Sequence, residues 1–132
     1  MQDKLKVLLI DDHPLMRRGI KQLVELDDNF EVVADVSSGT EGISVALQTS
    51  PDVIILDLNM KGLSGLDTLK GLRAEGVDAR ILILTVSDAK NDIYTLIDAG
   101  ADGYLLKDTE PDTLLDQIKR IAQGEVILSD SI

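Results

Sequence analysis

Short apolar runs alternate with amphipathic stretches along the chain. Residues 7–10, 53–56, 81–84 and 104–106 are runs of aliphatic side chains, with one tyrosine at the start of the last run. Unbroken runs of this kind are typical of strands covered on both faces, as in the middle of a parallel sheet. The run at 31–36 is more polar, which predicts a strand at the edge of the sheet.

The segments between the runs carry apolar residues at helical spacing. Pro14 and Pro111 each precede such a stripe, and proline is favoured in the first turn of a helix. Ser38 and Glu41 have the spacing of a capping box, and Ser64 is expected to cap a further helix. The buried face of the helix after Ser38 is expected to carry Ile43, Ala46 and Leu47. Helix ends are expected at Gly76, Gly100 and Gly124.

Five strands that alternate with five helices predict an α/β fold. Parallel strands need crossover connections, and these are right-handed. We therefore expect a (βα)5 doubly wound, flavodoxin-like fold, with a parallel five-stranded sheet in the order 2-1-3-4-5. The length of 132 residues and the hydrophobic fraction of 44% fit one domain, which we place at residues 1–124.

Polar side chains stand where four of the five strands end. They are Asp11 and Asp12 after the first strand, Asp57 at the third, Thr85 at the fourth and Lys107 after the fifth. In the expected strand order these four ends meet at one edge of the sheet, beside the switch point where ligands bind in such folds. Independent helix caps or surface charges have no reason to fall at these four places. The pattern therefore predicts a single site.

The residue types at this edge favour one kind of chemistry. Three crowded carboxylates repel one another unless a proton or a cation lies between them, and Mg²⁺ fits because it prefers oxygen ligands. The ammonium of Lys107 and the hydroxyl of Thr85 are suited to phosphoryl oxygens. Such a set favours phosphoryl transfer, with Asp57 as the carboxylate that forms an acyl phosphate.

Composition excludes several other functions. The formal net charge of -11 argues against direct contact with nucleic acid, because phosphate contacts need clustered lysine and arginine. Cysteine is absent, so neither a disulfide framework nor a cysteine-bound metal is expected. The chain has no apolar run near the roughly 20 residues of a membrane span, and we expect no targeting segment at its N-terminus. We expect a cytoplasmic protein without a membrane contact.

The five residues at the strand ends also carry a resemblance to a known family. Over residues 4–123 the chain resembles the receiver domain of two-component response regulators. The segments 11–19, 56–67 and 98–108 are similar to the NarL/FixJ subfamily, and within it to the nitrate/nitrite regulators. One departure from many receivers is aspartate in place of proline after Lys107, so the peptide bond between Lys107 and Asp108 is either trans or a cis bond held by its surroundings.

The resemblance implies a phosphorylation site and a metal site. Asp57 would receive a phosphoryl group from the phosphohistidine of a sensor histidine kinase. Mg²⁺ would be bound by Asp12, Asp57 and the backbone carbonyl of Asn59, with Asp11 acting through a water molecule.

The resemblance also implies a switch rather than an enzyme, one that assists its own phosphoryl transfer and dephosphorylation. Thr85 and Lys107 would hold the phosphoryl oxygens, and Tyr104 matches an aromatic residue whose rotamer follows that threonine. Tyr104 could equally be plain strand packing.

The partners implied are a sensor kinase, a homodimer formed on phosphorylation, and a C-terminal helix-turn-helix domain that binds DNA in transcription regulation. That DNA-binding domain is not in this chain, and residues 125–132 are expected to begin the linker to it.

Three other functions remain open from the residues alone. A phosphatase of the haloacid-dehalogenase type would need a second acid two residues after Asp57, where this chain has Asn59. A flavodoxin-like binding module would need a phosphate-binding loop after the first strand, where this chain has two acids. A pseudo-receiver that only binds partners would be expected to lack one of the five residues. His13 is expected to be a loop residue near the site.

Overall fold

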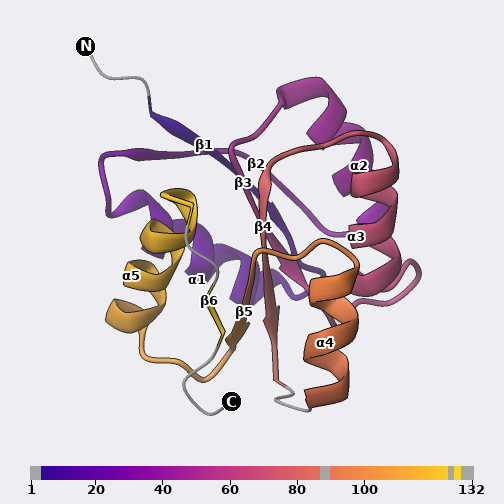
Figure 1. Ribbon diagram of the computed structural model, residues 1–132. Helices are drawn as coiled ribbons and strands as arrows, with labels where there is room; N and C mark the ends of the chain where they lie inside the picture. The colour runs from indigo at the N-terminus through magenta and orange to yellow at the C-terminus, as the bar shows by residue number, and fades with distance from the viewer. Residues whose placement is uncertain (1–3, 87–89, 125–126, 129–132) are drawn as a thin grey trace.

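The computed structural model describes residues 4–86, 90–124 and 127–128. The strands are β1 (Leu5–Ile10), β2 (Phe30–Val36), β3 (Val53–Asp57), β4 (Arg80–Thr85), β5 (Gly103–Leu106) and β6 (Ile127–Leu128). The helices are α1 (Pro14–Glu25), α2 (Gly39–Thr49), α3 (Gly65–Ala74), α4 (Lys90–Asp98) and α5 (Pro111–Ala122). Strands and helices alternate as expected (Figure 1).

The strands form one parallel sheet in the order β2-β1-β3-β4-β5-β6. The expected order 2-1-3-4-5 is therefore confirmed, and β2 lies at an edge. The two-residue strand β6 is an addition, and it pairs with Gly103 and Tyr104 of β5. The strand β6 lies within residues 125–132, the segment expected to begin a linker.

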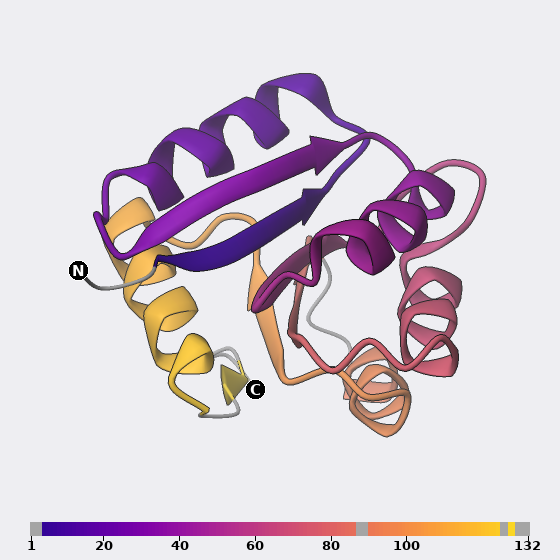
Figure 2. The same cartoon turned by 90° about the horizontal axis from the view of Figure 1, so that it is seen from above.

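Helices cover both faces of the sheet (Figures 1 and 2). On one face α1 and α5 contribute Ile20, Val24, Leu114, Ile118 and Ile121 to a core with the side chains of β1, β3, β4 and β5. The helices α2, α3 and α4 cover the other face, where the core includes Ala46, Leu69, Leu72, Ile93 and Leu96. Burial on both faces explains why the central strands are apolar without interruption.

The expected helix starts are largely as the sequence indicates. Ser38 Oγ accepts a hydrogen bond from the Glu41 N–H at 3.2 Å, and Ser64 Oγ accepts one from the Asp67 N–H at 3.1 Å. Pro14 and Pro111 stand in the first turns of α1 and α5. The glycines expected at three helix ends, Gly76, Gly100 and Gly124, all have positive φ angles.

One expectation about α2 is wrong. Leu47 was expected on the buried face, but its side chain is 51% exposed. The buried residues of α2 are Gly39, Gly42 and Ala46. A Cβ atom on Gly42 would collide with the side chain of Ile10, so this helix lies close against β1. Small residues line that contact. Ala46 and Ile43 do pack on the core, as expected, but the helical spacing also selects Leu47, which lies beside the contact and is exposed.

Within the part of the chain described by the structure, no helix is both long enough and apolar enough to cross a membrane.

Candidate functional site

The register of the sheet brings the expected polar residues to one edge. Ile10 pairs with Leu56, so the residues that follow them, Asp11 and Asp57, stand at neighbouring strand ends. Asp57 pairs in turn with Leu84, one residue before Thr85. The carboxyl ends of β1, β3, β4 and β5 therefore supply a shared site, as their parallel arrangement predicts.

Asp57 is one of the two fully buried acids of this site. The residue is 1% exposed, and its Oδ1 atom lies 2.8 Å from the Nζ atom of Lys107, whose side chain is 9% exposed. Oδ1 also accepts a hydrogen bond from the Asn59 N–H at 3.1 Å. One carboxylate oxygen is thus held by an ammonium and an amide, while Oδ2 faces the other acids.

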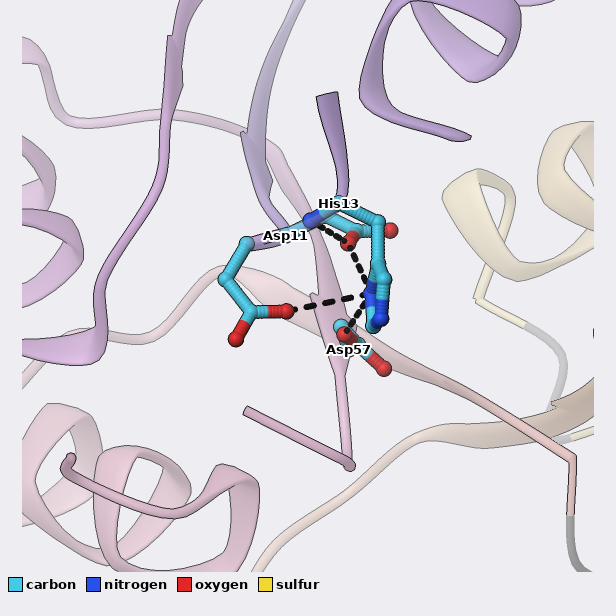
Figure 3. Close-up of side chains that lie close together, drawn as sticks. Asp11, His13 and Asp57 are labelled. Atoms are coloured by element: carbon cyan, nitrogen blue, oxygen red, sulfur yellow. Dashed lines mark hydrogen bonds and ion pairs between the residues drawn. The ribbon is translucent and has the colours of Figure 1, made fainter. Parts of the chain in front are cut away.

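Asp11 and Asp12 approach Asp57 from the end of β1 (Figure 3 shows Asp11 with Asp57). Asp11 is 1% exposed, and its Oδ1 atom accepts a hydrogen bond from the His13 N–H at 2.8 Å. Asp12 Oδ2 accepts one from the Lys61 N–H at 2.9 Å, which ties the β1–α1 loop to the β3–α3 loop. Arg17 Nη1 donates to the Asp11 carbonyl at 2.8 Å and so fixes the backbone between the two acids.

Burial raises the pKa of Asp11 above its ordinary value. The His13 backbone N–H acts in the opposite direction, and the neighbouring charge of Asp57 raises the pKa further. The repulsion between carboxylates that was expected from the sequence is thus present, but burial has the larger effect on the pKa of Asp11.

Three carboxylate oxygens in the described part of the site have no hydrogen-bond partner. They are Asp11 Oδ2, Asp12 Oδ1 and Asp57 Oδ2. Buried oxygens of this kind are costly unless a donor or a cation satisfies them. The donor set consists of hard oxygen atoms on three carboxylates, so it fits Mg²⁺.

Thr85 and Asn59 are linked in a way that the sequence did not suggest. Thr85 is fully buried, and its Oγ1 atom accepts a hydrogen bond from the Asn59 side-chain amide at 3.3 Å. Asn59 was expected to act only through its backbone carbonyl. Its side chain connects the loop after β3 to the end of β4.

Tyr104 is fully buried in the core on the α2–α4 face. Its place in the core suits either of the two interpretations made from the sequence. The Lys107–Asp108 peptide bond is trans, since the described residues contain no cis peptide.

His13 is more central than its expected place near the site. Its Nδ1 atom lies 3.3 Å from Asp11 Oδ1, 3.0 Å from Asp12 Oδ1 and 3.4 Å from Asp57 Oδ2 (Figure 3). The available signal was its position directly after Asp12, but the direction of a loop side chain cannot be read from an apolar pattern.

Comparisons with known proteins identify the class. The family model for the response regulator receiver domain matches residues 7–119 of the sequence. The chain belongs to this family. Response regulator receiver domains are signalling switches rather than classical enzymes.

Several curated relatives are similar over nearly the whole chain. The chain is 99% identical over 132 residues to the nitrate/nitrite response regulator protein homolog of Haemophilus influenzae, with coverage of 100% of this chain and 64% of that protein. It is 57% identical to the nitrate/nitrite response regulator protein NarP of Escherichia coli, with coverage of 96% and 59%. The corresponding identity to NarL of the same organism is 45%, with coverage of 99% and 61%. The chain thus spans about three fifths of these relatives.

Solved structures agree with the fold. A two-component response regulator of the LuxR family from Aurantimonas superposes with a TM-score of 0.93 at 31% identity, covering 98% of this chain and 93% of that one. The chemotaxis protein CheY4 of Vibrio cholerae superposes with a TM-score of 0.81 at 29% identity, covering 89% and 98%.

Proposed function

We propose that the chain is the phosphoacceptor domain of a two-component regulator and that Asp57 carries the phosphoryl group. The observation that supports this most directly is the contrast between the two oxygens of Asp57. Oδ1 lies 2.8 Å from the Lys107 ammonium, whereas Oδ2 faces the other carboxylates without a hydrogen bond. A carboxylate placed between a fixed cation on one side and a metal-binding set on the other is suited to phosphoryl transfer.

The residues proposed to bind Mg²⁺ are Asp12, Asp57 and the backbone carbonyl of Asn59, with Asp11 acting through water. The ion would neutralise the charge that three carboxylates and a phosphoryl group bring together. In the transfer, a carboxylate oxygen of Asp57 forms a bond to phosphorus and the P–N bond of a phosphohistidine breaks. The imidazole of the kinase leaves with the electron pair of that bond.

Thr85 and Lys107 are the groups that would receive the new phosphoryl oxygens. Lys107 already contacts Asp57, and the Asn59 amide donates to the Thr85 hydroxyl at 3.3 Å. If Thr85 turned toward the phosphoryl group, its bond to Asn59 would be exchanged for a charge-assisted one. Tyr104, at 0% exposure, would respond through packing in the core on its face of the sheet. The same residues would assist the later hydrolysis of the acyl phosphate.

The signal and the partners are inferred from relatives. Identity of 99% to a nitrate/nitrite response regulator homolog supports a role in the nitrate/nitrite response, with a sensor histidine kinase as phosphodonor in the cytoplasm. The matched region covers 59–64% of these relatives, which leaves room in them for a further domain. We infer from the family resemblance that it is a C-terminal DNA-binding domain, joined through residues 125–132 to a receiver at 1–124. We further propose that phosphorylation leads to a homodimer, and that the DNA-binding domain regulates transcription.

Incubation with a small phosphodonor such as acetyl phosphate tests the central step. We expect intact-mass spectrometry to detect one phosphoryl adduct in the native chain with Mg²⁺, and none without the ion. Asp57→Asn should form no adduct while keeping its circular dichroism spectrum. An unchanged adduct in that variant would overturn the assignment.

A further inference from the structure

His13 is fixed at the mouth of the acidic site by its local backbone. It is the residue before α1, with φ -98° and ψ 108°, and Pro14 holds it in this extended conformation. Its own N–H donates to Asp11 Oδ1 at 2.8 Å, and its ring does not cap the helix. The side chain is 58% exposed, so one edge of the ring meets solvent while Nδ1 faces the carboxylates.

The distances around Nδ1 have the size expected between ligands of one metal ion. Nδ1 lies 3.0 Å from Asp12 Oδ1 and 3.4 Å from Asp57 Oδ2, which belong to the two carboxylates proposed as direct ligands. It also lies 3.3 Å from Oδ1 of Asp11, the acid proposed to act through water. In an octahedral site with bonds of about 2.1 Å, neighbouring ligands are about 3.0 Å apart, and slightly longer bonds widen this spacing. Figure 3 shows the imidazole between Asp11 and Asp57.

The unsatisfied oxygens provide independent evidence for a ligand at this place. Asp11 and Asp57 are each 1% exposed, and each has an Oδ2 atom without a hydrogen bond among the described residues. Exposed acidic residues at the start of a helix are commonly solvated and need no ligand. Acids this deeply buried and only partly satisfied point to a bound cation.

We propose that His13 Nδ1 is a direct ligand of the divalent cation in this site, which makes the site a mixed nitrogen and oxygen one. The proposal rests on the metal site of the proposed function and adds a ligand to it. Imidazole nitrogen is a softer donor than carboxylate oxygen, so this set favours Mn²⁺ and Co²⁺ over Mg²⁺ more than an all-oxygen set does. Ligation uses the lone pair of Nδ1, and the ring proton then resides on Nε2, at the solvent side.

The opposite arrangement makes a contrary prediction. If Nδ1 carried a proton, the imidazole would donate a hydrogen bond to the carboxylates instead of binding the metal. A divalent cation in the site would then repel the ring. The ring would then leave the site when the metal binds. Direct detection of a nitrogen atom bonded to the metal distinguishes the two arrangements.

Pulsed electron paramagnetic resonance of bound Mn²⁺ is the measurement. The sequence contains a single histidine, so in the untagged 132-residue chain any metal-bound imidazole nitrogen belongs to His13. We expect electron spin echo modulation from a directly coordinated nitrogen, and we expect the modulation to change when ¹⁵N-histidine is incorporated. Weak or absent nitrogen coupling in the Mn²⁺ complex would overturn the proposal.

Metal competition provides the second readout. In His13→Ala we expect the ratio of Mn²⁺ to Mg²⁺ affinity to fall by roughly tenfold, since only the softer ligand is lost. Leu15→Ala, which changes a side chain that is 83% exposed in the same turn, should keep the native ratio. An unchanged ratio in His13→Ala would contradict the proposal.

The outcomes also separate the two levels of inference. Mn²⁺ binding that requires Asp57 but shows no nitrogen coupling would leave the proposed metal site standing and remove only His13 from it. Failure of the native chain to bind either Mn²⁺ or Mg²⁺ would overturn the metal site of the proposed function together with this proposal.

Discussion

Lys107 and Asp57 form a nearly buried ion pair. Their atoms are 2.8 Å apart, and their side chains are 9% and 0% exposed. The net stabilisation from a buried pair is small, because removing two charges from water offsets most of the attraction. The pair is therefore better explained by chemistry than by stability: it holds an ammonium where a phosphoryl group would arrive.

Lys107→Ala should separate phosphorylation from its structural consequence. We expect Mg²⁺ binding and a phosphoryl adduct to persist, because Lys107 is not a metal ligand. The amide signals of Thr85 and Tyr104 should shift much less on phosphorylation than in the native chain, since the cation that orders the phosphoryl oxygens is gone. Heteronuclear NMR measures this, with Lys70→Ala, an exposed lysine, as control. Native-sized shifts in Lys107→Ala would contradict the role given to this residue.

Asp11→Asn should stabilise the metal-free protein. The native carboxylate is 1% exposed, with one oxygen unsatisfied and Asp57 nearby. An amide removes the charge and keeps an oxygen to accept the His13 N–H bond. We expect a gain of roughly 1 kcal/mol or more in the free energy of unfolding by urea, and a smaller gain when Mg²⁺ is present. Asp116→Asn, at an exposed site, should have little effect. A less stable Asp11→Asn protein would be inconsistent with repulsion in the site.

At the scale of elements, the turn from β3 to α3 depends on glycine at position 65. A Cβ atom there would lie 2.5 Å from Leu58 Cα and 2.7 Å from the Asp57 carbonyl oxygen. Both neighbours are backbone atoms and cannot move aside as a flexible side chain could. The start of α3 can therefore approach the residue that follows Asp57 only because no side chain lies between them.

Gly65→Ala should destabilise the fold and weaken metal binding. The collision displaces the loop that carries Asn59, and overpacking of this kind costs about 1–3 kcal/mol. The matched control is Gly19→Ala within α1, where a Cβ atom meets nothing within 4 Å. That variant should gain up to about 1 kcal/mol, because alanine is the better helix former. Urea unfolding and Mg²⁺ titration measure both effects, and equal behaviour of the two variants would contradict the packing described.

Asp27 links the end of α1 to α5. The Asn29 N–H donates to its Oδ1 at 2.8 Å, and Lys119 Nζ lies 3.1 Å from its Oδ2. The hydrogen bond from Asn29, followed by Lys119, holds the pKa of Asp27 below its ordinary value of 3.8, while burial acts in the opposite direction. A lowered pKa means that the unfolded chain binds the proton more tightly, so this stabilisation is present above pH 3.8 and is lost as the pH falls through the folded value.

Asp27→Asn should therefore lower the stability of the fold only at pH values where the native Asp27 carboxyl is ionised. At neutral pH we expect a loss of at most about 1 kcal/mol, because the ion pair is partly open to solvent. Urea unfolding curves of the native and variant chains should converge below about pH 4 as the native carboxyl takes up its proton. A difference that grew toward acid pH would have the wrong sign.

At this scale the sequence predicts helix starts and ends reliably. It predicts the directions of individual side chains poorly. Ser38 and Ser64 cap their helices as expected, because capping is a local hydrogen bond. Leu47 is exposed because contact between α2 and β1 is made by small residues. The ring of His13 and the amide of Asn59 point into the site where the carboxylates of Asp11 and Asp57 and the hydroxyl of Thr85, which come from different strand ends, lie close together. Such directions depend on tertiary contacts that periodicity does not record.

At the scale of the whole molecule, apolar strand runs and helical stripes are enough to predict the sheet. The order 2-1-3-4-5 follows from parallel pairing and right-handed crossovers, and it brings Asp11, Asp57 and Lys107 to one edge. The sixth strand was not predicted, because two residues are too short to show a periodic pattern. It extends the sheet at the edge formed by β5, where it pairs with Gly103 and Tyr104.

Of the three clustered acids, Asp57 is the one we expect to accept the phosphoryl group. Reduction with borohydride converts an acyl phosphate to an alcohol, so the modified aspartate becomes homoserine and can be located by peptide mass spectrometry. After treatment with acetyl phosphate and Mg²⁺, we expect homoserine at position 57 alone. Homoserine at position 11 or 12, with residue 57 unmodified, would contradict the account.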